Sequence, residues 1–179
     1  MTSQICNIRK AVAEDLPAVY GIYDEIHTAE ESGNATIGWV REVYPTDSTA
    51  KKAFHDGELF VLEVGQKILG AAIINQRQAD AYKGAAWSQD VPDEKIMVLH
   101  TLVISPKTTG HGFGQKFVAF YEAYALANGC PYLRMDTNAK NSRARAMYQK
   151  LGYREIGIVP TVFNGIEDVQ LVLLEKTLC

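Results

Sequence analysis

The sequence predicts a mixed α/β fold with a partly antiparallel sheet, and three observations support this. The strand-like runs Leu59–Val64 and Lys67–Asn75, on either side of Gly65-Gln66, indicate an early antiparallel hairpin. A helical stripe at Gly112–Asn128 lies between two strand-like runs, and a helical crossover joins strands that run parallel. The chain ends in a second hairpin, with strands at Tyr153–Val162 and Asp168–Leu174 around Asn164-Gly165. Together these elements indicate one mixed sheet.

Before the first hairpin, the pattern predicts one short strand and two helices. Gln4–Arg9 has the residues of a short strand. Over Ala13–Ala29, apolar residues recur at three- and four-residue spacing, which indicates one buried helical stripe. Pro17 falls in the first turn of that helix, where a missing N–H has little effect. A second helix is capped within Thr46–Ser48, runs to about Asp56 and ends at Gly57.

The early hairpin is followed by a long connection. Its strands, Leu59–Val64 and Lys67–Asn75, are joined by Gly65-Gln66, a pair typical of a tight turn. Gln76–Glu94 then has little periodicity over about 19 residues. Connections longer than about 12–15 residues are uncommon in compact domains and often form functional lids. A functional lid is therefore one candidate role for this connection.

Lys95–Ile104 is predicted to be the central strand of the sheet. Apolar side chains occupy both of its faces, which is typical of a strand that is covered on both sides. Simple alternation places His100 on the same face as Val98 and Leu102.

Glycines mark the predicted ends of the two remaining helices, with one strand between them. The helix at Gly112–Asn128 ends at Gly129, and Tyr132–Thr137 is the strand that follows it. A short helix, Asn141–Leu151, ends at Gly152 before the final hairpin.

Length and charge narrow the class of protein. With 179 residues the chain predicts one domain, residues 1–179, with a substantial core. A net charge of −3 and a pI near 5.8 argue against bulk binding to nucleic acid or to an anionic membrane. No apolar run approaches the roughly 20 residues of a membrane-spanning helix. Met1–Gln4 lacks a signal-peptide layout, which predicts cytoplasmic residence.

Cysteine and histidine positions predict reduced thiols and no metal site. The cysteines lack CxxC spacing and are Cys6, Cys130 and Cys179. The histidines are too dispersed to suggest a ligand set and are His27, His55, His100 and His111.

The most informative segment is Thr109–Gln115, Thr-Gly-His-Gly-Phe-Gly-Gln, at a strand-to-helix turn. Main-chain amides at such a helix N-terminus bind anions, most often phosphate. The segment is not a Walker loop, because no Gly-Lys-Ser/Thr follows, and Gln115 interrupts the dinucleotide pattern. Close packing of helix against sheet is the alternative reason for these glycines.

Three motifs in order closely resemble the GNAT superfamily of N-acetyltransferases. They lie between Leu99 and Tyr153 and read Leu102-Val103-Ile104-Ser105-Pro106, then Thr109–Gln115, then Asn141-x-x-Ala144-x-x-x-Tyr148-x-x-Leu151-Gly152-Tyr153. The resemblance implies a GNAT-like mixed sheet of about six to seven strands flanked by about four helices. It also implies acetyl-CoA as co-substrate, without a metal.

The resemblance assigns residues to the coenzyme. Loop amides hold its pyrophosphate, which implicates Thr109, Gly110, His111, Gly112, Phe113, Gly114 and Gln115. Backbone groups of Leu102, Val103 and Ile104 hold the pantetheine arm and polarise the carbonyl, on a strand that splays from its neighbour. Asn141 caps the last short helix and matches a residue that contacts the pantetheine.

One position departs from the family pattern. Thr109 stands where the family usually has arginine or glutamine, so one charged phosphate contact is missing. The cations nearby that could supply it are Lys107, Lys116, Arg143 and Arg145.

The resemblance also implies catalytic roles. Tyr148 matches the general acid, and a tyrosine with a pKa near 10 stays protonated at neutral pH. Packing at helical spacing is the alternative role for Tyr148. His100 is the first candidate base, with a buried core histidine as the alternative reading. Asp136, at the end of the next strand, is the rival base, and a water chain is a third possibility.

The expected function is acetyl transfer from acetyl-CoA to a primary amine of a small molecule or peptide, by direct attack in a ternary complex. Alternatives are a non-catalytic acetyl-CoA sensor or scaffold, use of a longer acyl-CoA, and a generic nucleotide-binding protein. Family members often form homodimers. Aromatic candidates for the acceptor site are Trp39, Tyr44, Tyr82 and Trp87.

Overall fold

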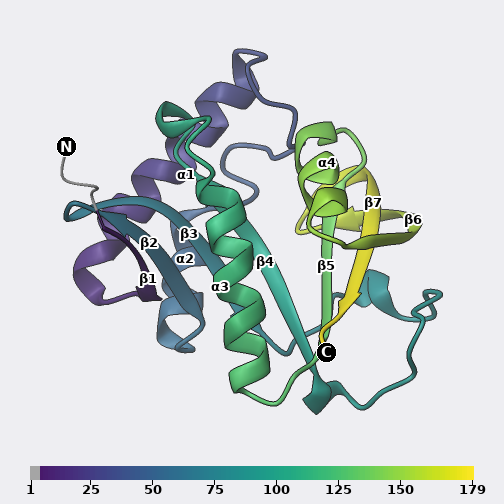
Figure 1. Cartoon of the computed structure of the whole chain (residues 1–179). Coiled ribbons are helices and arrows are strands. Elements are labelled where there is room, and N and C mark those ends of the chain that lie inside the picture. Colours follow the sequence, from purple (N-terminus) through teal and green to yellow (C-terminus); the bar gives the residue numbers. More distant parts are fainter. Residues whose placement is uncertain (1–4) are drawn as a thin grey trace.

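A computed structural model describes residues 5–179 and shows one mixed seven-stranded sheet with four α-helices (Figure 1). The predicted first-strand residue Gln4, like the rest of Met1–Gln4, lies outside the described residues. The strands are β1 Cys6–Lys10, β2 Leu59–Val64, β3 Lys67–Asn75, β4 Ile96–Ile104, β5 Tyr132–Asn138, β6 Arg154–Phe163 and β7 Ile166–Thr177. The α-helices are α1 Leu16–Glu31, α2 Asp47–His55, α3 Phe113–Ala127 and α4 Ser142–Lys150.

The strand order is β1-β2-β3-β4-β5-β7-β6, and only β4 and β5 run parallel. The predicted fold class is therefore confirmed, with α3 as the crossover helix. Both predicted hairpin turns form as expected. Gly65-Gln66 and Asn164-Gly165 have positive φ at both central positions, 54° and 68° in the first and 51° and 81° in the second. That conformation matches the twist of antiparallel strands.

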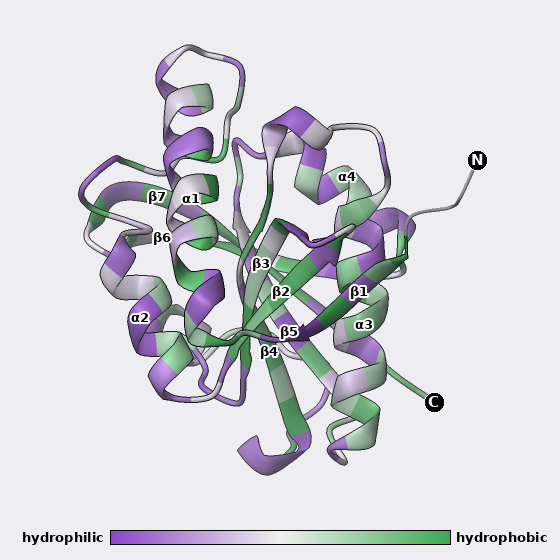
Figure 2. Ribbon diagram, turned by 90° about the vertical axis from the view of Figure 1, so that its left-hand side faces the viewer, coloured by the Kyte–Doolittle hydropathy of each residue, from purple (hydrophilic) through white to green (hydrophobic). Residues whose placement is uncertain are grey.

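Two layers of helix enclose the sheet. In Figure 1, α3 and α4 lie in front of it and α1 and α2 behind it. The front core joins α3 side chains, such as Phe117 and Tyr121, to Leu99 of β4. The rear core joins α1 and α2 to β2 and β3. Figure 2 shows the apolar strands in the middle of the molecule and mixed polarity on the helices around them. No helix in the described part of the chain has the length and apolarity needed to cross a bilayer.

The connection between β3 and β4 is a packed segment, so the prediction of a lid was wrong. It contains two short 3-10 turns, Asp80–Tyr82 and Asp93–Lys95. Tyr82 is buried against the rear of the sheet, and Trp87 Nε1 donates to the main-chain oxygen of Tyr82 at 3.0 Å. Arg134 of β5 lies over the Trp87 ring, 4.2 Å from its centroid. Aromatic anchoring therefore fixes a segment that has little periodicity.

A β-bulge in β4 corrects the predicted facing of Leu102. His100 pairs with Ile73, and Val103 pairs with Ala71. Between these two pairs β4 therefore contains one more residue than β3. Thr101 lies within the bulge at φ 50°. The extra residue moves Leu102 to the front core with Leu99, whereas Val98 packs at the rear. His100 remains on the rear face, beside Asn75 of β3.

Candidate active site

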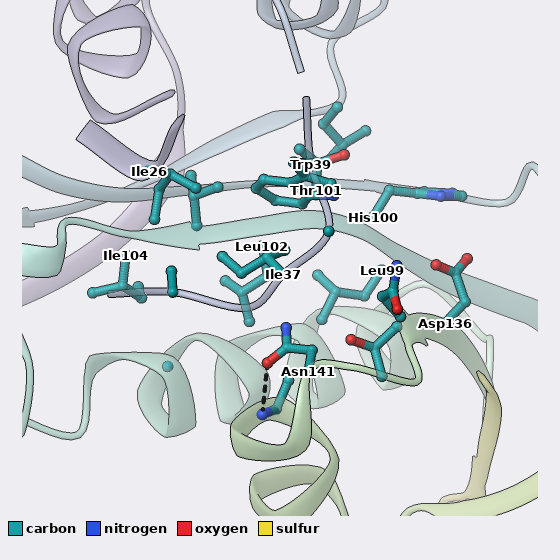
Figure 3. Close-up of a pocket in the computed structure, with 18 of the residues that line it drawn as sticks. Ile26, Ile37, Trp39, Leu99, His100, Thr101, Leu102, Ile104, Asp136 and Asn141 are labelled. Carbon is teal, nitrogen blue, oxygen red and sulfur yellow. Dashed lines mark hydrogen bonds between the residues drawn. The ribbon is translucent and has the colours of Figure 1, made fainter. Parts of the chain in front are cut away.

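A cavity of about 1290 Å³ runs along β4 between the two helical layers. Its walls come from β4, β5, α4, the loop before α3, the α1–α2 loop and the tip of the β6–β7 hairpin. Figure 3 shows His100 and Asp136 at one end of the cavity, Ile104 at the other, and Asn141 across from Leu102. The structure thus brings the predicted catalytic and coenzyme residues to one cavity, except for His111, which does not line it.

The cavity lies where β4 and β5 separate. The two strands pair from Ile96 with Tyr132 to Leu99 with Met135, and the pairing stops there. Both strands continue, β4 to Ile104 and β5 to Asn138. The expected splay is therefore present. Main-chain groups on this side of β4 beyond the paired segment are available to a ligand.

The glycine-rich loop has a row of amides without protein partners. Within residues 5–179, none of the seven main-chain N–H groups from Thr109 to Gln115 donates a hydrogen bond to another residue. Gly110 and Gly112 have φ 88° and 71°, and Gly112 caps the N-terminus of α3. A helix N-terminus with unsatisfied amides is an anion site. The loop therefore has the chemistry expected for a pyrophosphate.

The structure narrows the choice of a cation beside this loop. Lys107 bonds to Glu25 at 2.6 Å, and Arg145 bonds to Glu155 at 2.8 Å. Arg143, on the first turn of α4, lines the cavity and has no ion pair among the described residues. Lys116 also has no ion pair among the described residues, but its Nζ lies over the Phe113 ring, 5.7 Å from the centroid, and the residue does not line the cavity. Arg143 is therefore the candidate that lines the cavity and is available to a phosphate.

Side chains of the loop fold back on the loop itself. His111 Nδ1 lies 3.0 Å from the main-chain oxygen of Thr108, and its ring stacks on Phe113 with centroids 5.6 Å apart. Thr109 Oγ1 donates to the main-chain oxygen of Pro106 at 2.9 Å. Because both side chains contact the loop itself, its main chain is the part that remains able to contact a ligand.

Tyr148 reaches the cavity from the front layer. Its side chain is buried, and burial, with a further contribution from the charge of Asp136, raises the pKa of the phenol well above its ordinary value. Among the described residues the hydroxyl has no hydrogen-bond partner, and the side chain lines the cavity. Asn141 Oδ1 accepts from the amide of Ala144 at 3.2 Å, which confirms the predicted cap. A protonated phenol therefore faces the cavity.

Asp136 reaches the same cavity from the rear layer. The Tyr82 hydroxyl donates to Asp136 Oδ2 at 2.6 Å, and the second carboxyl oxygen has no partner within residues 5–179. Surrounding protein raises the pKa of Asp136 to about 6 by desolvation. Sequence reasoning missed the role of Tyr82, because a contact across 54 residues leaves no local signal.

His100 is held by a chain of polar side chains. Asn75 Nδ2 donates to Glu58 at 3.0 Å, and Asn75 Oδ1 accepts from the amide of Arg77 at 2.9 Å. His100 Nε2, 2.9 Å from the same oxygen, must therefore carry the proton, which leaves Nδ1 as the acceptor. Burial lowers the pKa of His100 to about 4. His100 is therefore neutral across the physiological range.

The α1–α2 loop covers the cavity opposite β4. Tyr44 Oη and Thr101 Oγ1 form a short hydrogen bond, so the loop is tied to the bulge. Glu30 accepts from the amides of Ile37 and Gly38 at 2.8 and 2.9 Å. A Cβ on Gly38, at φ 84°, would lie 2.3 Å from the Asn138 side chain on β5. Glycine at this position allows the loop to cross to β5.

The structure divides the predicted aromatic candidates into two groups. Trp39 and Tyr44 line the cavity, with ring centroids 6.1 Å apart. Tyr82 and Trp87 pack on the rear of the sheet as described above. Within residues 5–179 no group of three or more His, Cys, Asp or Glu side chains is arranged to hold a metal ion.

Comparison with known proteins identifies the family. The chain matches the model of the Acetyltransferase (GNAT) family over residues 17–153. It belongs to that family. A GNAT-family acetyltransferase from Streptococcus agalactiae has the same fold, with 22% identity over 96% of this chain and 95% of that one and a TM-score of 0.76. The predicted resemblance is confirmed.

Two further GNAT structures extend the comparison. The Salmonella typhimurium protein yncA, in a structure with its cofactor acetyl-CoA, has 16% identity over 98% of this chain and 95% of that one, with a TM-score of 0.70. The ribosomal-protein-S18-alanine N-acetyltransferase from Escherichia coli has 18% identity over 97% and 94%, with a TM-score of 0.67. At such low identities the likeness concerns the fold.

Proposed function

We propose that this GNAT protein transfers an acetyl group from acetyl-CoA to a primary amine by direct attack in a ternary complex. The observation that carries the proposal is the run of seven unpartnered amides, Thr109–Gln115, beside a splayed strand pair. The amides and Arg143 suit a pyrophosphate. The open edge of β4 at Leu102–Ile104 and the side-chain NH2 group of Asn141 suit the pantetheine arm.

Two side chains on opposite faces of the sheet supply the proton transfers. Acetyl-CoA supplies the acetyl group as a thioester, and the amine nitrogen bonds to the acetyl carbon as the carbon–sulfur bond breaks. Tyr148, from the front layer, donates a proton to the leaving thiolate, since its raised pKa keeps it protonated. The nitrogen, once bonded to the acetyl carbon, releases its second proton to solvent, and the tyrosine recovers a proton from solvent. The products are the N-acetyl amine and the free thiol.

Asp136 is the better candidate for the base that deprotonates the incoming ammonium. A base works best when the pKa of its conjugate acid lies near the working pH. Asp136 has a pKa of about 6, whereas that of His100 is about 4. The unpartnered oxygen of Asp136 also lines the cavity. His100 then has a positioning role, as the end of the chain from Glu58 through Asn75.

Replacement of Tyr148 by phenylalanine tests this proposal. Loss of a general acid typically lowers the rate by about 10²-fold or more. We expect Tyr148→Phe to lower kcat to that extent and to leave the Kd of acetyl-CoA, measured by calorimetry, nearly unchanged. Tyr153→Phe is the matched control, because Tyr153 donates to Glu122 at 3.0 Å behind Tyr148. Equal turnover of both variants across a panel of amines would refute the acid role.

A further inference from the structure

The end of the cavity farthest from the glycine-rich loop has a largely apolar wall. His100 lies four residues before Ile104 along β4, roughly 13 Å at 3.3 Å per residue. We call the region around it the distal end. The apolar side chains that line the cavity from the segments opposite β4 are Trp39 and Tyr44 of the α1–α2 loop and Phe163, Val169 and Leu171 of the β6–β7 hairpin, and Tyr44 bonds to Thr101, the residue next to His100.

The two segments that form these walls meet each other. A Cβ on Gly165, at the hairpin tip, would lie 3.3 Å from the Val43 side chain of the α1–α2 loop. Val169 and Leu171 are buried, with 5% and 1% exposure. The distal end is therefore enclosed on this side by contact between the loop and the hairpin, which favours a small acceptor.

Charged groups at the distal end are already paired, with one exception. Arg77 bonds to Asp56 at 3.1 Å and also to Glu58. Lys52 bonds to Asp56 at 2.7 Å. Asp136 has no cationic partner within residues 5–179, since its one bond is from a tyrosine hydroxyl. The distal end therefore offers one unpaired carboxylate and no unpaired cation.

The polar side chains next to His100 are occupied as well. Asn75 bonds to three protein groups, as described for His100. Gln78 bonds to Asp93 at 2.6 Å through Nε2 and to Arg134 through Oε1. The Thr101 hydroxyl bonds to Tyr44. These groups have little remaining capacity to recognise polar substituents on an acceptor.

We propose that the acceptor is a small primary amine on an aromatic or other apolar body, without a carboxylate next to the nitrogen. This inference rests on the proposed function. The ammonium pairs with Asp136, and the apolar body lies between Trp39, Tyr44 and Phe163. A carboxylate beside the amine would lie close to Asp136 without a cation to neutralise it, and like charges at short range repel. The second ammonium of a diamine would be buried among apolar side chains, which is unfavourable.

Acceptors that share one ring but differ in charge distinguish the effect of charge on the rate from that of shape. Phenethylamine, phenylalaninamide and phenylalanine share one ring, and only phenylalanine carries an anion next to the amine. Release of free thiol from acetyl-CoA reports the rate. We expect kcat/KM for phenethylamine and phenylalaninamide to exceed that for phenylalanine by at least about tenfold, the equivalent of 1.4 kcal/mol. We expect 1,4-diaminobutane to be poorer than phenethylamine by a similar factor.

A pair of hairpin variants tests where the apolar body lies. Phe163→Ala removes one wall of the distal end, whereas Val162→Ala alters the adjacent side chain, which is 65% exposed. We expect Phe163→Ala to raise KM for phenethylamine and to leave KM for ethylamine unchanged. Val162→Ala should change neither value.

The possible results separate two failures. If thiol is released but phenylalanine or the diamine is the better acceptor, this inference is wrong and the proposed function stands. If Phe163→Ala affects ethylamine and phenethylamine equally, the inference is wrong as well. If acetyl-CoA binds but no amine in a broad panel is acetylated, the proposed function fails and this inference fails with it.

Discussion

The hydrogen bond between Tyr44 and Thr101 allows a specific test of how the α1–α2 loop supports the bulge in β4. Thr101 adopts φ 50°, a conformation that costs a β-branched residue about 1–2 kcal/mol. Its hydroxyl bonds to Tyr44, which joins the α1–α2 loop to β4, the strand that we propose holds the thioester. Burial raises the pKa of Tyr44 to about 12, so the phenol stays protonated. We infer that Tyr44 keeps the bulge in its observed conformation.

Tyr44→Phe removes this bond and leaves the Thr101 hydroxyl without its partner. One net hydrogen bond contributes about 0.5–1.5 kcal/mol, and an unsatisfied buried group costs about 1–3 kcal/mol. We therefore expect the free energy of unfolding to fall by about 1–2 kcal/mol. A bulge that is less well held should also orient the thioester poorly. A barrier increase of 1.4 kcal/mol corresponds to a roughly tenfold lower kcat.

A double-mutant cycle in urea gives the decisive measurement. Glycine adopts positive φ without strain, so in a Thr101→Gly background the Tyr44→Phe change should cost little or nothing. Tyr23→Phe is the matched control, because the buried Tyr23 hydroxyl has no hydrogen-bond partner in the described structure. It should be neutral or stabilising. If Tyr44→Phe costs the same in both backgrounds, or no more than Tyr23→Phe, the coupling does not exist.

Three further predictions concern charge and backbone. The pKa of Asp136 rises from 3.8 to about 6 on folding, so ionisation of this carboxyl opposes folding. As the pH rises from 4 to 6, the free energy of unfolding of wild type, measured in urea, should therefore fall by up to about 3 kcal/mol relative to that of Asp136→Asn. Arg143→Ala should weaken acetyl-CoA binding in calorimetry by several-fold, about 1 kcal/mol, whereas Lys107→Ala, which breaks an ion pair outside the cavity, should not. Gly38→Ala should destabilise the fold in thermal melts by about 1–3 kcal/mol more than Gly33→Ala, since both have positive φ but a Cβ fits only at Gly33. An equal effect within any of these pairs would contradict the corresponding argument.

Local patterns predicted most of the fold. The first hairpin, Leu59–Val64 and Lys67–Asn75, forms with the predicted bounds, because the turn pair Gly65-Gln66 separates two apolar runs. The helices end near the predicted glycines for the same local reason. The glycine loop before α3 and the cap at Asn141 also lie where the motifs predicted them, since both depend on short stretches of sequence.

The part of the cavity between the bulge in β4, the α1–α2 loop and the β6–β7 hairpin could not be predicted in this way. Threonine is a poor residue for positive φ, so nothing at Thr101 indicated a bulge, and one extra residue there turned Leu102 to the other face. The bond from Tyr82 to Asp136 and the packing of Trp87 join distant segments. Such contacts arise from tertiary packing and have no periodic signature. Those contacts give Asp136 a tyrosine hydroxyl as its partner, and no cation pairs with it among the described residues.

Amide-resolved NMR of the labelled protein, titrated with acetyl-CoA, tests the central claim most directly. The amides of Thr109–Gln115 lack protein partners, so they should exchange rapidly with solvent before the titration. Saturation with acetyl-CoA should shift their signals, slow their exchange and also shift the signals of Leu102–Ile104. Binding that leaves both segments unchanged, or no binding at all, would contradict the account.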